Sequence, residues 1–299
     1  MSTIDFDVGP EITLGDGDHV DLRPNWNADS RSIIFERRSG GGSQLHLMTL
    51  RANGGIDTIN ALELCNVGGS KVQGRAALFA QDDFAFVSDR SGRSAIWRAD
   101  LRNKTVRQLT WPDADERDYG PATWPINTPR ERLLFFRSRL PDGKPGIYLS
   151  EPGKDARMVT KQGVTADQPW PMGTDDAFVF HQNHGGDAQV ISQRIDGSAG
   201  QTSLSSTSEG TSYATPFPSP DGQHIAFVSA LSGSAQVWVM RSDGTHRQQV
   251  TFDGASYFPA WSPDGSRLVF VRGDLFSNQS TGQLRIVNVT AFSRDAALA

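Results

Sequence analysis

The sequence of 299 residues has a single cysteine, Cys65, and no apolar run long enough to cross a bilayer. One cysteine excludes an internal disulfide and any cysteine-based metal cage. Its neighbours Leu62 and Leu64 favour a buried small side chain over a reactive thiol. A membrane-spanning helix would need about 20 consecutive apolar residues. The sequence therefore predicts neither a disulfide scaffold nor a membrane span.

Basic clusters and a strong net charge are also missing. The 29 Lys and Arg residues stand against 34 Asp and Glu residues, which gives a formal net charge of −5. Nucleic acids and anionic membranes are held largely by Lys and Arg side chains that neutralise phosphates. We therefore expect no nucleic-acid partner.

The first 24 residues contain no basic segment followed by an apolar core, as a secretory signal would. As given, the sequence predicts a cytoplasmic protein, or a periplasmic one if a leader has been removed. Common catalytic signatures are missing too, since there is no G-x-S-x-G, no HExxH, no P-loop and no G-x-G-x-x-G after a strand. Motifs alone thus identify no enzyme class.

What the sequence does contain is a repeat, which is clearest at residues 256–271, SYFPAWSPDGSRLVFV. Pro259 fixes φ near the start of a strand, and Trp261 gives that strand a large apolar anchor. The segment 263–265, Pro-Asp-Gly, predicts a tight turn. The apolar run at 268–271 then predicts a buried second strand.

The same order of aromatic anchor, turn and apolar run returns five times upstream. The anchors lie 44 to 53 residues apart, at Trp26, Phe79, Trp124, Trp170, Phe217 and Trp261. A period in this range, with four short strands per unit, is typical of β-propeller blades. We therefore predict an all-β fold, in which residues 1–299 form a single six-bladed β-propeller of four-stranded blades.

The N-terminal segment 11–14, EITL, is similar to the end of the later units, such as 107–111 (RQLTW) and 249–252 (QVTF). No such segment follows 284–289, the third strand expected in the last blade. We therefore predict that the N-terminal strand pairs into the last blade and closes the ring. Closure of this kind protects sheet edges that would otherwise be exposed.

The segment 257–271, together with QVWVMRSDGTHRQQVTFDG at 236–254, resembles the WD-like repeats of TolB-type six-bladed propellers. The same repeat builds the propellers of prolyl-oligopeptidase relatives and of oligogalacturonate lyase. The resemblance is close in blades five and six and weaker elsewhere. It implies the fold, whereas propellers host many unrelated functions. The sequence shows neither the hydrolase domain of the peptidases nor the additional N-terminal domain of TolB.

The loops before the inner strands, and those between second and third strands, are expected to gather on one face of a propeller. This face is the predicted binding site, because every blade contributes a loop to it. Its candidate ligand-binding residues are His19, Asp118, Tyr119, Arg137, Asp167, His181, His184, Tyr213, Tyr257 and Arg272. The three tyrosines recur at nearly the same spacing before a proline, and this repetition favours a scaffold role for them, with ligand binding as the alternative.

His181 and His184 form the most suggestive local cluster. The resemblance to oligogalacturonate lyase implies a divalent metal held by His and Gln ligands on the propeller face. A metal needs three or more converging ligands, however, and only His19 is expected on a neighbouring loop. We therefore expect no cofactor, and we interpret these histidines as exposed loop residues.

Two functions stay open at this point. The favoured one is a non-catalytic binding module that holds a protein segment, a peptide or a polar ligand at the channel mouth, with a protein or peptide as the main partner. The alternative is a carbohydrate-active lyase or hydrolase. In that enzyme Arg137 would pair with a substrate carboxylate, a histidine or tyrosine would move the proton, and Asp167 would orient it.

Overall fold

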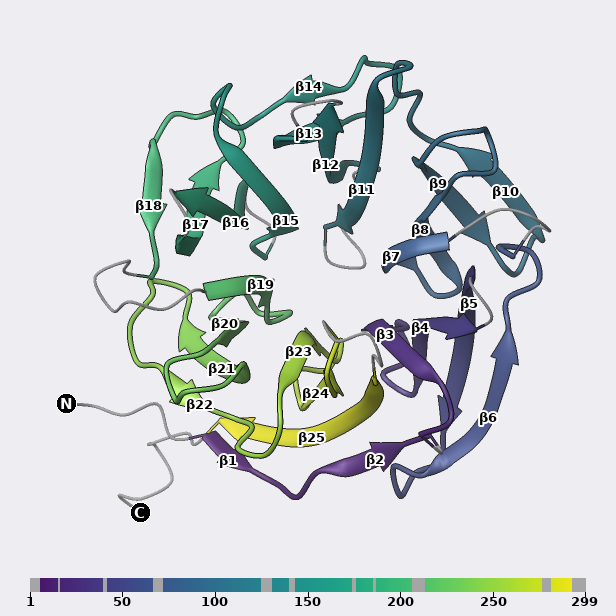
Figure 1. Cartoon of the computed structure of the whole chain (residues 1–299), viewed down its shortest axis with the longest axis vertical. Helices are drawn as coiled ribbons and strands as arrows, with labels where there is room; N and C mark the ends of the chain where they lie inside the picture. The colour runs from purple at the N-terminus through teal and green to yellow at the C-terminus, as the bar shows by residue number, and fades with distance from the viewer. Residues whose placement is uncertain are drawn as a thin grey trace.

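The computed structural model describes residues 6–15, 17–39, 42–66, 72–124, 131–139, 143–173, 176–184, 187–205, 213–275 and 281–291. Six antiparallel sheets stand around a central channel, as Figure 1 shows. The predicted all-β six-bladed propeller is therefore confirmed. In the part of the chain that is described, no helix is long and apolar enough to span a bilayer.

Each of the first five blades is a four-stranded meander whose first strand borders the channel (Figure 1). Blade one contains β3 (Val20–Trp26), β4 (Ser32–Ser39), β5 (Gly42–Leu50) and β6 (Ile56–Ala61). Blade two contains β7 (Val72–Ala80), β8 (Asp83–Ser88), β9 (Ala95–Asp100) and β10 (Thr105–Gln108). Blade three contains β11 (Glu116–Thr123), β12 (Leu133–Arg139), β13 (Pro145–Ser150) and β14 (Arg157–Met158). Blade four contains β15 (Thr165–Pro171), β16 (Ala177–His184), β17 (Asp187–Arg194) and β18 (Gln201–Ser203). Blade five contains β19 (Tyr213–Pro218), β20 (His224–Ser229), β21 (Gln236–Arg241) and β22 (Gln248–Gln249).

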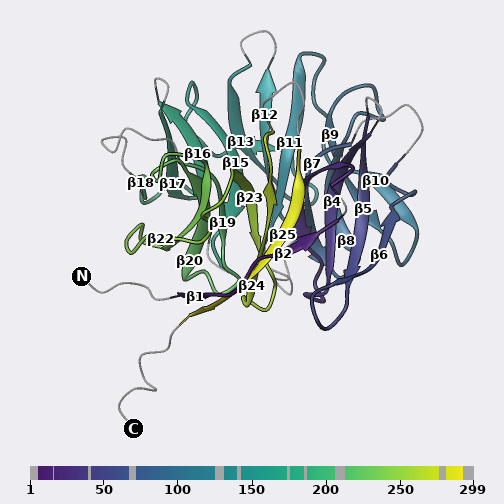
Figure 2. The same ribbon diagram turned by 60° about the horizontal axis from the view of Figure 1, so that its bottom comes forward.

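Blade six is completed by the N-terminal part of the chain, as predicted. Its strands β23 (Ser256–Trp261), β24 (Arg267–Arg272) and β25 (Gln283–Ala291) are joined by β1 (Phe6–Val8) and β2 (Ile12–Leu14), which both pair with β25. Figure 2 shows β2 running beside β25 at the edge of the ring. The closing segment thus includes β1, a strand that the repeat pattern did not predict.

Phe6 extends the closure to the neighbouring blade. Its side chain is only 6% exposed and meets the His224 ring edge-on, with 4.9 Å between ring centroids. The Gln248 side chain bonds both the backbone N–H and the carbonyl of Phe6, each at 2.9 Å. The first strand of the chain therefore fastens blade six to blade five.

The core lies between neighbouring blades and is built mainly from the second strands. In β24, Leu268 to Val271 are all fully buried, as the continuous apolar run predicts for a strand covered on both faces. Each blade contributes at least one phenylalanine with at most 1% exposure from its second strand, among them Phe35, Phe86, Phe135, Phe180, Phe227 and Phe270. The small cluster around Cys65 is also buried, and burial raises the pKa of this thiol to about 12. The thiol is therefore uncharged at neutral pH.

A β-bulge interrupts the inner strand of every blade at a matching position. In five blades the bulge holds a residue with positive φ followed by a proline, at Arg23–Pro24, Gly120–Pro121, Gln168–Pro169, Thr215–Pro216 and Phe258–Pro259. This conformation is unfavourable for the β-branched Thr215 (φ 48°), so the flanking sheet must hold it in place. Blade two differs, since three residues between Gln73 and Ala77 form its bulge, and Arg75 is among them.

We expect Phe6→Ala to lower the free energy of unfolding by about 3 kcal/mol, because it removes a buried aromatic side chain from the closure. Deleting residues 1–15 should cost more still, since it leaves the edge of β25 unpaired. Urea unfolding measures both effects. Asp7→Ala is the matched control, because Asp7 is exposed on the same strand. Equal midpoints for the Phe6 and Asp7 variants would contradict a closing role for Phe6.

Candidate functional site

The propeller has two faces that differ in chemistry. On the entry face the inner strands begin and the second strands end, so that Asp118 pairs with Arg137 and Asp167 with His181 in the strand register. On the turn face the inner strands end in the turns around 27–31, 219–223 and 262–266. The candidate residues named from the sequence belong to the entry face.

Arg137 is held by two carboxylates of its own blade. Its Nε and Nη2 donate to the two oxygens of Asp118 at 2.6 and 3.0 Å, and its Nη1 lies 2.8 Å from a Glu116 oxygen. Burial raises the pKa of Asp118, although the hydrogen bonds from Arg137 act against this shift. Blade one repeats the pair, with Asp21 and Arg37 at 2.7 Å. The repetition indicates that such pairs join the first two strands of a blade.

His181 and Asp167 occupy the matching position in blade four. The Nδ1 atom of His181 lies 2.9 Å from an Asp167 oxygen. The other ring nitrogen, Nε2, is buried and has no hydrogen-bond partner among the described residues. The structure thus brings together two of the residues that the enzyme hypothesis named. His184 ends β16 and pairs with Asp187 in the strand register, while its side chain lies outside the described part of the structure.

The three tyrosines differ in their surroundings. Tyr119 is partly buried and stacks on Phe136, with 5.6 Å between ring centroids. Tyr213 is fully buried, and its hydroxyl accepts a hydrogen bond from Arg247 at 3.1 Å. Tyr257 is half-buried, and burial raises the pKa of its hydroxyl. Tyr213 therefore belongs to the packed scaffold, whereas Tyr257 stays partly accessible.

The remaining two candidates lie near the blade-six closure. Arg272 is bonded to Glu11 at 2.5 Å and to the hydroxyl of Ser256 at 3.0 Å. His19 is half-buried in the segment that leads into β3. Within the described residues, no group of three or more His, Cys, Asp or Glu side chains could hold a metal. That these candidate residues bind a ligand stays a prediction.

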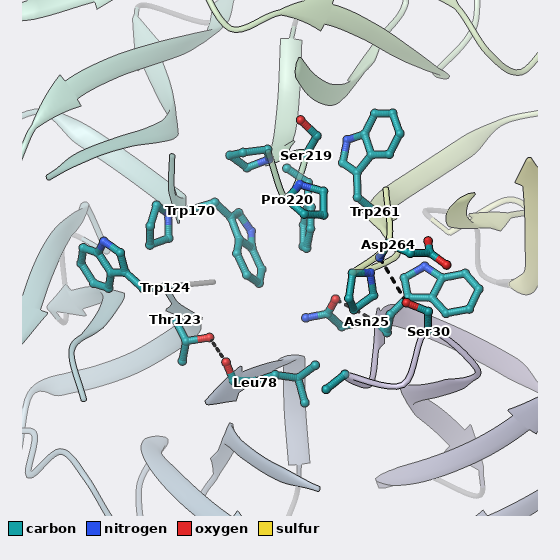
Figure 3. Close-up of a pocket in the computed structure, with 16 residues that line it drawn as sticks. Asn25, Ser30, Leu78, Thr123, Trp124, Trp170, Ser219, Pro220, Trp261 and Asp264 are labelled. Carbon is teal, nitrogen blue, oxygen red and sulfur yellow. Dashed lines mark hydrogen bonds between the residues drawn. The ribbon is translucent and has the colours of Figure 1, made fainter. Parts of the chain in front are cut away.

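The turn face carries a cavity that the sequence did not predict (Figure 3). This turn-face pocket has a volume of about 500 Å³ and is lined by the ends of inner strands from all six blades. Its wall includes the anchors Trp26, Trp124, Trp170, Phe217 and Trp261, together with Pro171, Pro218, Pro220 and Pro263. The repeat had indicated these anchors as core residues. Their convergence around one opening depends on the closed ring.

Blade two contributes Leu78 to the pocket, in place of the predicted anchor Phe79. Leu78 faces Phe84 in the strand register, as Trp26 faces Ile33 in blade one. Phe79 points to the other side of β7, where the Arg98 guanidinium lies 4.4 Å from its ring centroid. The longer bulge of blade two shifts the alternation of side chains, and alternation decides which residue meets the channel.

The rim of the pocket is built from turns stabilised by aspartate. In blade six the Asp264 carboxylate accepts hydrogen bonds from the Ser262 hydroxyl at 2.5 Å and from the backbone N–H of Ser266 at 3.0 Å. Burial opposes the charge, but these hydrogen bonds lower the pKa of Asp264. Asp221 makes the corresponding bonds in blade five. The turn signal read from the sequence therefore positions the pocket rim.

Replacing Arg137 by alanine should lower the free energy of unfolding by about 3 kcal/mol, because it leaves the buried carboxylate of Asp118 without its ion-pair partner and Glu116 with Arg139 alone. Arg139→Ala is the matched control. Arg139 also bonds Glu116, at 2.7 Å, but its side chain is 60% exposed, so we expect a loss below about 1 kcal/mol. Urea unfolding of both variants measures the difference. Similar losses would contradict a scaffold role specific to Arg137.

Comparison with known proteins gives no matching family model for this chain. An uncharacterized protein of Agrobacterium fabrum is 32% identical over 171 residues, which are 54% of this chain and 56% of that protein. A TolB homologue of Chlorobium chlorochromatii is 30% identical over 224 residues, which are 74% of this chain and 44% of the relative. The chain thus spans about half the length of the curated relatives it matches.

Solved structures show the same fold. A protein of Agrobacterium tumefaciens provisionally described as TolB superposes with a TM-score of 0.69 and 16% identity, covering 98% of this chain and 100% of that one. An oligogalacturonate lyase in complex with manganese gives a TM-score of 0.62 and 15% identity, covering 97% of both chains. Together with the 30% identity to TolB homologues, these findings support a TolB-type six-bladed β-propeller.

Proposed function

We propose that this propeller is a non-catalytic binding module that holds a segment of another protein in the turn-face pocket. The observation that carries the proposal is the pocket itself, in which rigid aromatic and proline side chains from several blades surround about 500 Å³. Pockets of roughly 300 to 1,000 Å³ lined by such side chains are typical of ligand sites. Aromatic anchors also dominate the energy of protein interfaces.

The chemistry of the pocket supports binding over catalysis. Asp264 is the one titratable residue among the described residues that line it. Its carboxylate is held by the turn of blade six and has a lowered pKa, so it is poorly suited to act as a general acid or base near neutral pH. The remaining polar lining groups are amide and hydroxyl side chains such as Asn25 and Thr123. Asn25 donates to the carbonyl of Ala76 and Thr123 to that of Leu78, and their oxygens keep acceptor capacity for a peptide N–H.

The likeness to TolB homologues supports a protein partner for this chain. A peptide segment also fits the dimensions of the site, because a few side chains would fill the pocket while the backbone crosses the rim. Because the wall is held by closed sheets, little of the binding energy would be lost in ordering it.

A pocket-blocking variant tests the proposal. Ala28 lies on the pocket lining and is partly exposed, so Ala28→Arg should fill the opening without removing a core contact. Peptides selected from a displayed random library against the parent protein should bind this variant at least about tenfold more weakly, since the anchors become inaccessible. Calorimetry on synthetic copies of the selected peptides measures the affinities.

Leu231→Arg is the matched control for added charge and bulk. Leu231 is 37% exposed and lies between β20 and β21, on the entry face. Peptide affinity should be unchanged in this variant. Selection of no peptide at all, or equal loss of affinity in the two variants, would overturn the proposal.

A carbohydrate-active function is the second candidate, because Asp167 and His181 are hydrogen-bonded on the entry face and His181 Nε2 is unpaired within the described residues. The likeness in fold to oligogalacturonate lyase suggests the substrate to try. Under the binding proposal, incubation with oligogalacturonate and Mn²⁺ gives no unsaturated product at 235 nm. If the parent protein cleaves oligogalacturonate and His181→Ala abolishes this cleavage, the protein is an enzyme whose site lies on the entry face.

A further inference from the structure

Arg75 is a buried arginine on the inner strand of blade two. Its side chain is 6% exposed, and its guanidinium carbon lies 4.9 Å from the ring centroid of Phe217 and 5.5 Å from that of Trp170. Both rings belong to the wall of the turn-face pocket, and they come from blades five and four. Arg75 therefore reaches from blade two across the channel to two rings of that wall.

The one other buried arginine among the described residues, Arg132, and the half-buried Arg37, Arg98 and Arg137 have a carboxylate partner, whereas the half-buried Arg90 bonds a hydroxyl and a backbone carbonyl. Arg37, Arg98, Arg132 and Arg137 each contact an aspartate at 2.6 or 2.7 Å, or at 2.5 Å for the shorter bond of Arg98. Arg75 makes neither an ion pair nor a hydrogen bond within the described residues, and its Nη2 is buried without a partner. This arginine is thus exceptional in lacking an acceptor.

The guanidinium of Arg75 is nevertheless charged at neutral pH. Burial, with the nearby charge of Arg23, lowers the pKa of Arg75 to about 9. Arg23 cannot compensate this charge, since it is itself a cation and is paired with Glu36 at 2.7 Å. The cation–π contacts with Phe217 and Trp170 recover less than removing an unpaired charge from water costs. The native fold therefore carries a charge that its described residues do not neutralise.

Two further polar groups of the inner strands are unpaired among the described residues. The indole Nε1 of Trp261 and the hydroxyl of Thr215 are buried without a hydrogen-bond partner. By contrast, the indole of Trp26 donates to the carbonyl of Ala260 at 3.2 Å. An indole N–H and a guanidinium are donors only, and a hydroxyl can donate as well. The inner strands thus contain buried hydrogen-bond donors without an acceptor among the described residues.

We propose that the ligand of the turn-face pocket is anionic, and that a carboxylate of this ligand passes the aromatic wall and pairs with Arg75. The inference rests on the proposed binding function and adds the chemistry of the partner. A carboxylate matches the planar fork of a guanidinium and can accept two parallel hydrogen bonds from it. In a protein segment, the C-terminal carboxylate or an Asp or Glu side chain supplies this group.

The test compares ligands that differ only in charge. Indole-3-acetate and indole-3-acetamide are titrated by ligand-observed NMR against the parent protein, Arg75→Met and Arg75→Lys. The parent should bind the carboxylate at least about tenfold more tightly than the amide, as expected for a charge-assisted pair. Arg75→Met should bind both alike, whereas Arg75→Lys should retain part of the preference. Binding of neither probe, or a preference that persists in Arg75→Met, would overturn the inference.

Unfolding distinguishes a ligand-binding arginine from a structural one. Arg75→Met keeps apolar contact with Phe217 and Trp170 and removes a buried unpaired charge, so its urea midpoint should equal or exceed that of the parent. A clearly lower midpoint would assign Arg75 to the scaffold and contradict the inference.

Peptides separate this inference from the binding function on which it rests. The selected peptides are synthesised as free acids, as C-terminal amides, and as amides with one internal Asp, which identifies the source of the carboxylate. Peptides that bind but show no dependence on a carboxylate would leave the binding function intact and overturn the anionic ligand. Failure of all peptides, with an Arg75-dependent preference for indole-3-acetate, would overturn the protein partner and support a small anionic ligand.

Discussion

The pairing of β1 and β2 with β25 is the constraint on which the rest of the propeller depends. A single blade is a narrow sheet that cannot bury its two faces, so each blade relies on its neighbours for a core. Pairing the two ends of the chain makes blade six complete and gives every blade two neighbours. Phe6 strengthens this arrangement, because it belongs to blade six and packs on His224 of blade five. The closed ring then fixes the distance at which the inner strands face one another across the channel.

Within that ring, the bulges of the inner strands decide what faces the channel. A residue with positive φ followed by proline bends the strand in five blades, and the bend carries a cost for residues such as Thr215. The cost is acceptable because the neighbouring sheet hydrogen bonds hold the strand on both sides of the bulge. Blade two, with its longer bulge, presents Leu78 to the pocket and directs Arg75 to the rings of Phe217 and Trp170. Blade two, which departs most from the repeat, thus supplies Arg75, the buried arginine without an acceptor among the described residues.

The two faces of the ring divide the polar chemistry unevenly. On the entry face, acids at the start of inner strands are matched to cations at the end of second strands, as Asp21 with Arg37 and Asp118 with Arg137. Such pairs hold strands together and leave little charge for a substrate, with His181 as the partial exception. On the turn face the lining is aromatic and contains little titratable chemistry. The contrast agrees with the proposed recognition on the turn face, where Arg75 contacts two rings of the pocket wall.

The sequence by itself determined the number of blades, the closure by the N-terminal strand and the turns at 263–265 and its equivalents. These features follow from local signals, namely a period, an apolar run and turn residues, which need no knowledge of distant contacts. The tertiary structure alone decided that Trp26, Trp170 and Trp261 surround a cavity, that Arg137 is occupied by Asp118 and Glu116, and that Arg75 lies unpaired against two pocket rings. The physical reason is that these relations join residues far apart in sequence, whose distances are set only when the ring closes. Alternation within a strand also depends on bulges, so the exchange of Leu78 for Phe79 could not be read from the repeat.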